Sequence, residues 1–180
     1  MSENNLATGT GRCDALAAAA DSILSQCESL LLEVPDSVYI AEAQTIQGGT
    51  LGKHLRHTLD HFAAAFTHAG PIDYDHRARN VPMETDRQAA LAQVAFLKER
   101  AGSLGHRLSG DSVSVRVMIA GDGREMILGS TLGREMAFAT HHAVHHLAMM
   151  RAIAGAFGID LPDVVGKAPS TINFERQAGR

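Results

Sequence analysis

Histidine is the residue of this sequence whose numbers and spacing most suggest chemistry. The chain has ten histidines in 180 residues. Seven of them lie in two short segments, GKHLRHTLDH and THHAVHHLA: His54, His57, His61, His141, His142, His145 and His146. Histidines four positions apart on a helix are neighbours one turn apart, so two imidazoles can bind one ion. A third imidazole from another helix would leave an open position for water or substrate, as expected at a catalytic metal.

In the later segment, helical phase separates inward from outward histidines. At about 100° per residue, His142 and His146 fall within the same apolar stripe as Phe138 and Ile153. The other two histidines of that segment fall on its flank. A neutral imidazole inside an apolar stripe needs a polar partner, and a metal ion satisfies two imidazoles at once. We therefore expect His142 and His146 to bind a metal.

In the earlier segment, helical phase leaves the inward residue open. Leu55 and Leu59 mark the apolar stripe, and His54 or His61 lies nearer to it than His57 does. A helix in a bundle contacts two neighbours, however, so its inward arc is wide and His57 stays a candidate.

Acidic and basic side chains near these segments could handle protons or substrate. Glu135 lies on the stripe of His142, where a carboxylate is costly unless it pairs, orients a ligand or moves a proton, so we predict a catalytic role. Glu84 is expected to be a solvated surface charge. The loop YDHRARN is a candidate substrate-binding segment, because guanidinium groups match carboxylates: Asp75, His76, Arg77 and Arg79.

The elements that must position these residues are mainly helices. Apolar residues at helical spacing predict four helices: 13–34, 50–68, 85–108 and 131–157. Alternating apolar residues and a glycine-rich turn predict a two-stranded β-hairpin between the third and fourth helices. Two prolines predict an irregular tail after Gly158. The pattern indicates a mainly α fold, an up-and-down four-helix bundle with the hairpin inserted before the last helix, as one domain over residues 1–180.

Composition narrows the class of protein. The chain is 45% hydrophobic and 20% charged, with a net charge of −4, which argues against disorder and against binding nucleic acid or an anionic membrane. No uninterrupted apolar segment has membrane-spanning length. Cys13 and Cys27 lie about 21 Å apart on one predicted helix, too far for a disulfide. We expect reduced thiols and a cytoplasmic location.

The segments GKHLRHTLDH and HHAVHHLAMMRAIAGAFGI, together with four helices, resemble the DinB-like superfamily of metal-dependent enzymes. The resemblance covers nearly the whole chain. It implies a four-helix bundle, often dimeric, in which three histidines hold nickel or zinc. In that family the early ligand follows a glycine by five residues and the late pair precedes a glycine. The resemblance therefore implies His57, His142 and His146 as ligands.

Relatives in that superfamily include bacillithiol- and mycothiol-dependent transferases and a maleylpyruvate isomerase. The resemblance thus implies a divalent-metal-binding homodimer that acts as a metal-dependent hydrolase or a thiol-dependent transferase. Its substrate would be a small molecule such as a low-molecular-weight thiol. The alternative is a non-catalytic dimeric bundle with a structural or adventitious ion, and a third reading is a metal-free bundle whose histidines bond to core carbonyls.

Overall fold

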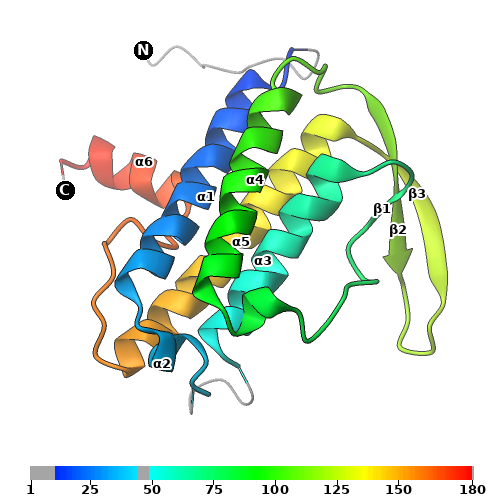
Figure 1. Ribbon diagram of the computed structural model, residues 1–180. Coiled ribbons are helices and arrows are strands. Elements are labelled where there is room, and N and C mark those ends of the chain that lie inside the picture. Colours follow the sequence, from blue (N-terminus) through cyan, green and yellow to red (C-terminus); the bar gives the residue numbers. More distant parts are fainter. Residues whose placement is uncertain (1–10, 44–48, 180) are drawn as a thin grey trace.

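The protein is mainly helical with a small β-sheet at one side, in a computed structural model that describes residues 11–43 and 49–179. Four long helices lie side by side (Figure 1): α1 (Asp14–Glu33), α3 (Leu51–Thr67), α4 (Arg87–Leu104) and α5 (Leu132–Ala156). Helices α1 and α3 each pack against both α4 and α5. The four helical segments expected from apolar spacing are thus confirmed.

One hydrophobic core joins these four helices. Leu24, Leu59, Leu97 and Leu147, one from each long helix, are fully buried in it. Burial of such side chains stabilises the fold by about 1.5–3 kcal/mol each. Because all four helices contribute to the same core, their relative positions are fixed, and so is any site built between two of them.

Side-chain caps set where the helices begin. The hydroxyl of Thr50 accepts a hydrogen bond from the backbone N–H of Lys53 at the start of α3. The hydroxyl of Thr131 accepts one from the backbone N–H of Arg134 at the start of α5. Helix α4 begins at Arg87 rather than at Thr85, because the carboxylate of Asp86 accepts from the backbone N–H of Gln88. The helix expected to start at residue 85 therefore begins two residues later.

The sheet has three strands, one more than the predicted hairpin. Strands β2 (Ser112–Met118) and β3 (Glu125–Thr131) pair antiparallel across a turn in which Gly123 has a φ of +86°, a conformation that favours glycine. Strand β1 (Ile72–Asp73) pairs parallel with β2. It directly precedes the loop YDHRARN, and its two residues are too few to show a period in the sequence.

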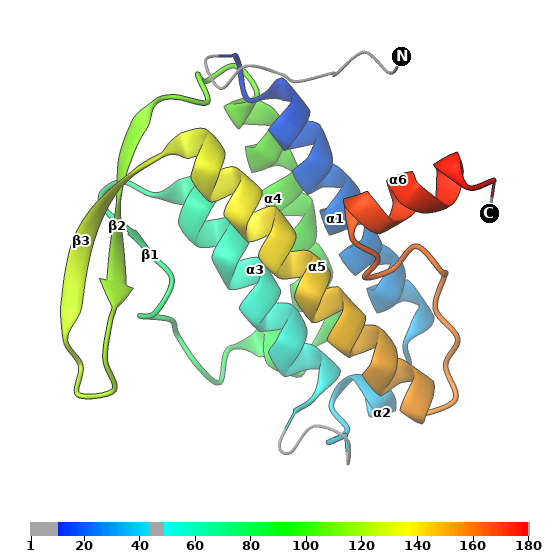
Figure 2. The same ribbon diagram turned by 180° about the vertical axis from the view of Figure 1, so that it is seen from behind.

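The remaining elements are short: α2 (Asp36–Tyr39), the 3₁₀ turn η1 (Pro82–Glu84) and α6 (Pro169–Gln177). The prediction of an irregular tail is wrong for α6. Pro169 occupies the first helical turn, where its missing N–H is not needed, so it starts a helix instead of breaking one. Figures 1 and 2 show α6 and the sheet on opposite sides of the long helices.

Helix α1 combines two features that the sequence leaves ambiguous. Its length and hydropathy would allow it to cross a membrane, yet its apolar face is packed against α4 and α5, as in the core helix of a compact domain. Cys13 and Cys27, at and within this helix, are free and buried. Burial raises the pKa of the Cys27 thiol to about 12, which keeps it protonated and unreactive.

Candidate metal centre

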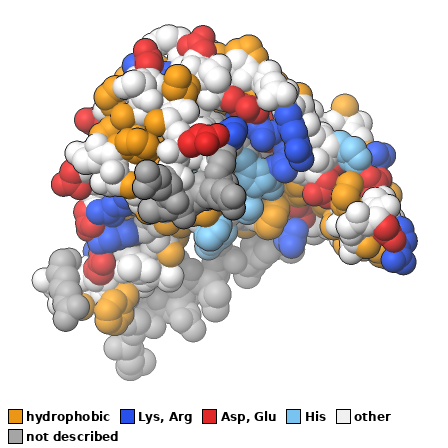
Figure 3. Space-filling model, turned by 90° about the horizontal axis from the view of Figure 1, so that it is seen from below, with side chains coloured by type: hydrophobic (Ala, Val, Ile, Leu, Met, Phe, Trp, Pro, Cys, Tyr) orange, Lys and Arg blue, Asp and Glu red, His pale blue; other side chains and the backbone are white. Residues whose placement is uncertain are grey.

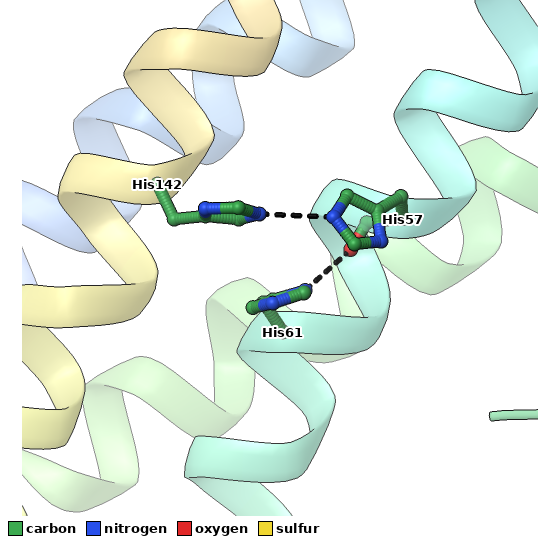
Figure 4. A group of neighbouring side chains, drawn as sticks. All are labelled: His57, His61 and His142. Carbon is green, nitrogen blue, oxygen red and sulfur yellow. Dashed lines mark hydrogen bonds between the residues drawn. The ribbon is translucent and has the colours of Figure 1, made fainter. Parts of the chain in front are cut away.

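Five imidazoles gather between α3 and α5: His54, His57, His61, His142 and His146. Figure 4 shows three of them, with His57 and His61 on α3 facing His142 on α5. The Nε2 atoms of His57 and His142 lie 3.0 Å apart. Two nitrogen ligands of one tetrahedral zinc ion lie about 3.3 Å apart, given Zn–N bonds of about 2.0–2.1 Å. The spacing of these two rings therefore suits ligands of a common ion.

His61 completes the most compact group. One ligand atom from each of His57, His61 and His142 lies within 4.8 Å of the other two. The Nδ1 of His61 lies 2.9 Å from the backbone carbonyl of His57. When Nδ1–H donates to that carbonyl, the lone pair is on Nε2, the atom left free for a ligand. His61 is also buried, as its helical phase predicts.

His146 lies beside this group. It is buried, and its ring centroid is 4.5 Å from that of His57 and 4.6 Å from that of His142. The rings of the three histidines expected as ligands therefore lie close together, but the group whose ligand atoms lie within 4.8 Å of one another contains His61 in place of His146. The Nδ1 of His146 faces the Nδ1 of His54 at 3.3 Å. His141 and His145 are exposed, as their position on the flank of α5 predicts.

His61, His142 and His146 are neutral at physiological pH. Burial lowers the pKa of His61 and of His142 to about 4, and it lowers that of His146 to about 3. For His142 and His146, electrostatic repulsion between protonated histidines would lower the pKa further, and the charge of Arg77 adds to this for His142. Neutral imidazole is the form that binds a transition metal. These side chains are thus ready to act as ligands without first losing a proton.

Arg77 contacts the other edge of His57. Its guanidinium meets the Nδ1 of His57, and because a guanidinium can only donate, Nδ1 is the acceptor. A neutral His57 would then carry its proton on Nε2, the atom that lies 3.0 Å from Nε2 of His142. Burial lowers the pKa of Arg77, and the nearby charges of Arg56 and Arg79 lower it further. Figure 3 shows basic side chains gathered next to the histidine surface.

Glu84 is buried beside this basic group, so the expectation of a solvated surface charge is wrong. Its carboxylate accepts from the backbone N–H of Asn80 at 3.1 Å and pairs with Arg56 at 3.2 Å. Arg56 also pairs with Asp60 at 3.0 Å. Two carboxylates therefore pair with Arg56, and with the loop arginines Arg77 and Arg79 the group keeps one positive charge in excess.

The four loop residues expected to bind substrate do not act as one group. Arg77 contacts His57, and Arg79 is exposed near it. His76 instead bonds to Asp73 and to Glu125, each at 3.0 Å, at the edge of the sheet. Asp75 accepts from the backbone N–H of Met118 and faces a pocket. Strand β1 explains the division, because pairing with β2 draws the start of the loop toward the sheet.

Glu135 is fully buried and reaches the histidines through Tyr74. Its carboxylate accepts from Tyr74 Oη at 2.8 Å, from Arg134 Nη1 at 2.7 Å and from the hydroxyl of Ser130. Burial alone would raise its pKa, but these three hydrogen bonds outweigh that effect and hold the pKa below its usual value. The Tyr74 ring stacks on His61. Glu135 therefore orients Tyr74 against the histidine cluster.

A pocket of about 570 Å³ adjoins the histidines on the side of the sheet. His61, Tyr74 and Phe138 form its end nearest the cluster, and side chains of β2 and β3 form the opposite wall. The sequence gives no indication that Tyr74 belongs here. It follows a strand of two residues, in a segment without a hydrophobic period, and its partner Glu135 is 61 positions away.

Comparisons with known proteins leave the family open. No family model and no solved structure matches the chain. Over 103 residues it is 33% identical to a protein named FK506-binding protein 5 from Rhizopus delemar. The match covers 56% of this chain and 26% of that protein, so the chain corresponds to about a quarter of the relative's length.

Proposed function

We propose that this protein binds a divalent transition metal in an up-and-down four-helix bundle of the DinB-like type. The observation that carries the proposal is the 3.0 Å approach of two Nε2 atoms, His57 on α3 and His142 on α5. Neutral imidazoles are the donors that zinc and nickel accept, although imidazole suits several other transition metals. From the resemblance we further propose a cytoplasmic homodimer.

His57 and His142 belong to both candidate ligand sets, and the third ligand is His61 or His146. His61 is favoured by its hydrogen bond to the carbonyl of His57, which leaves its Nε2 available. His146 is favoured by the resemblance and by its ring lying within 4.6 Å of the other two. With either choice three protein ligands leave a position for water or substrate.

The reaction we propose is metal-dependent hydrolysis or transfer to a thiol. A bound ion of this kind lowers the pKa of water to about 7, polarises a carbonyl or deprotonates a thiol. The chain itself supplies positive charge beside the histidines, through Arg77 and Arg79. This charge suits a small substrate with an anionic group. Glu135 would act by holding Tyr74 against His61, because its own oxygens are occupied by three donors.

The second candidate is a non-catalytic bundle with a structural or adventitious ion. The observation in its favour is the surplus of imidazoles, since five rings gather where a catalytic ion needs three. Four protein ligands would close the coordination sphere. Replacing the ion with Co²⁺ distinguishes the two, because added thiolate changes the visible spectrum when the ion has an exchangeable position and leaves it unchanged when four imidazoles enclose it.

Metal content tests the proposal directly. Tag-free protein should contain about one ion per chain, and the double variant His57→Ala/His142→Ala should contain almost none. The matched control is His141→Ala/His145→Ala, which removes two exposed histidines from the same segment of α5 and should leave the metal content unchanged. Equal metal in wild type and in the His57/His142 variant would overturn the proposal, provided that circular dichroism shows both to be folded.

A further inference from the structure

We propose that the pocket between the sheet and α5 receives an aromatic group of the substrate that reacts at the histidine cluster. The inference rests on the proposed function and extends it from a metal site to a substrate class, a small molecule with an aryl group. The pocket holds about 570 Å³, within the range of about 300–1,000 Å³ typical of small-molecule sites.

The walls of the pocket are apolar where they face the bundle and the strands. Phe138 and Tyr74 meet edge to face, with ring centroids 5.1 Å apart, and Val115, Val117 and Leu128 lie across from them on the sheet. Leu128 is 44% exposed although it lies in a concave wall. Apolar surface left exposed in a hollow is what an apolar ligand would cover.

The charged groups of the pocket are already paired. Arg134 lies 2.7 Å from Glu135, and Arg116 lies 3.8 and 3.9 Å from two carboxylates at the edge of the sheet. Asp75 accepts from a backbone N–H of β2. An ionic group entering the pocket would have to break one of these interactions, whereas an uncharged ring would not.

Continuity with the histidine cluster identifies the occupant as part of the substrate. The ring of His61 lines the pocket and also belongs to the compact histidine group. Tyr74 stacks on His61 at 5.0 Å, and His61 stacks on His142 at 4.1 Å. A planar group in the pocket would meet ring faces and edges that already favour aromatic partners. Its reacting atom would then lie toward the histidines.

Two thiols provide a test on Co²⁺-loaded protein. Benzyl mercaptan and ethanethiol are titrated separately, and binding is followed through the thiolate-to-cobalt absorption band. The ratio of the two dissociation constants removes differences in metal affinity between variants. We expect Phe138→Ala to reduce the preference for the benzyl thiol by about fivefold or more, because it removes one aromatic wall. Phe96→Ala, at an exposed position on α4, should leave the ratio unchanged.

A second pair of variants guards against a folding defect in Phe138→Ala. Leu128 and Ile127 are adjacent on β3 and similarly exposed, but only Leu128 lines the pocket. Leu128→Ala should lower the benzyl preference and Ile127→Ala should not. If cobalt binds and neither pocket variant changes the ratio, the inference is overturned while the proposed function stands. If cobalt does not bind, the proposed function is overturned, and this inference with it.

Discussion

The phenol ring of Tyr74 lies nearly parallel to the imidazole of His61, with ring centroids 5.0 Å apart and an angle of 13° between the planes. Tyr74 directly follows β1, whereas His61 lies in the middle of α3. The contact therefore joins the sheet to the histidine cluster. Glu135, on α5, fixes the other end of Tyr74 by accepting its hydroxyl hydrogen. The small sheet thus serves as the support for one side of the candidate metal centre.

Glu135→Gln should destabilise the protein at neutral pH. The buried carboxylate accepts three hydrogen bonds, and the amide would present N–H groups to donors, so we expect a loss of about 1–3 kcal/mol in the free energy of unfolding. Urea unfolding at pH 7 measures it. Glu99→Gln, at an exposed site on α4, should change stability by less than about 0.5 kcal/mol.

The same substitution should change the pH dependence of stability. The pKa of Glu135 is lower in the folded protein than its ordinary value of 4.5, so the stabilisation is present above pH 4.5 and is lost as the pH falls through the folded pKa. The stability difference between wild type and Glu135→Gln should therefore shrink below pH 4.5. A difference that stays constant down to pH 3 would show that the carboxylate charge does not contribute.

The third ligand can be identified by single substitutions. We expect His61→Ala to weaken zinc affinity by more than 100-fold, and His146→Ala to weaken it by about 10- to 100-fold, as removal of a supporting residue does. Competition with a chromophoric chelator measures both. The reverse order would assign the third position to His146, and a loss of less than tenfold in both variants would mean that neither is a ligand. His145→Ala, an exposed change beside His146, is the control.

Helical phase predicted which histidines face inward on α5 but left the choice open on α3, for a physical reason. Around His142 and His146 the helix is rich in apolar residues, so the inward stripe is well defined and both side chains are at least partly buried. Helix α3 contacts α4 on one side and α5 on the other, which widens its inward arc. Phase selected His54 or His61, the resemblance selected His57, and all three rings reach the cluster. The roles of His146 as ligand and of Glu135 in catalysis stay predictions.

The features that sequence reasoning missed depend on long-range contacts or on short elements. Strand β1 has two residues, and only its pairing with β2 defines it. The sequence predicts that Pro169 breaks a helix, yet it occupies the first turn of α6, and a single proline does not reveal which of the two roles it has. The contact of Tyr74 with Glu135 spans 61 positions and leaves no local pattern.

Arg77→Ala should strengthen metal binding. Arg77 donates to Nδ1 of His57, which places the proton of that imidazole on Nε2, the atom that faces His142. Binding an ion through Nε2 requires the proton to move to Nδ1, where it opposes the guanidinium. We expect zinc affinity to rise about tenfold in Arg77→Ala, measured by chelator competition. Arg79→Ala removes a nearby charge without that contact and should have a smaller effect. Weaker binding in Arg77→Ala would show that Arg77 supports His57 as a ligand.

Gly52→Ala should destabilise the start of α3. A Cβ at this position would lie 2.0 Å from the backbone carbonyl oxygen of Glu84, so α3 and η1 would have to separate. We expect a loss of about 1–3 kcal/mol in the free energy of unfolding, measured in urea, as in other overpacked sites.

Gly155→Ala on α5 is the matched control, since its Cβ would meet nothing within 4 Å, and it should stabilise by up to about 1 kcal/mol through helix propensity. Equal stability of Gly52→Ala and wild type would contradict the close approach of α3 to η1. Because Glu84 pairs with Arg56, one residue before His57, the separation should also lower metal affinity, which Gly155→Ala should leave unchanged.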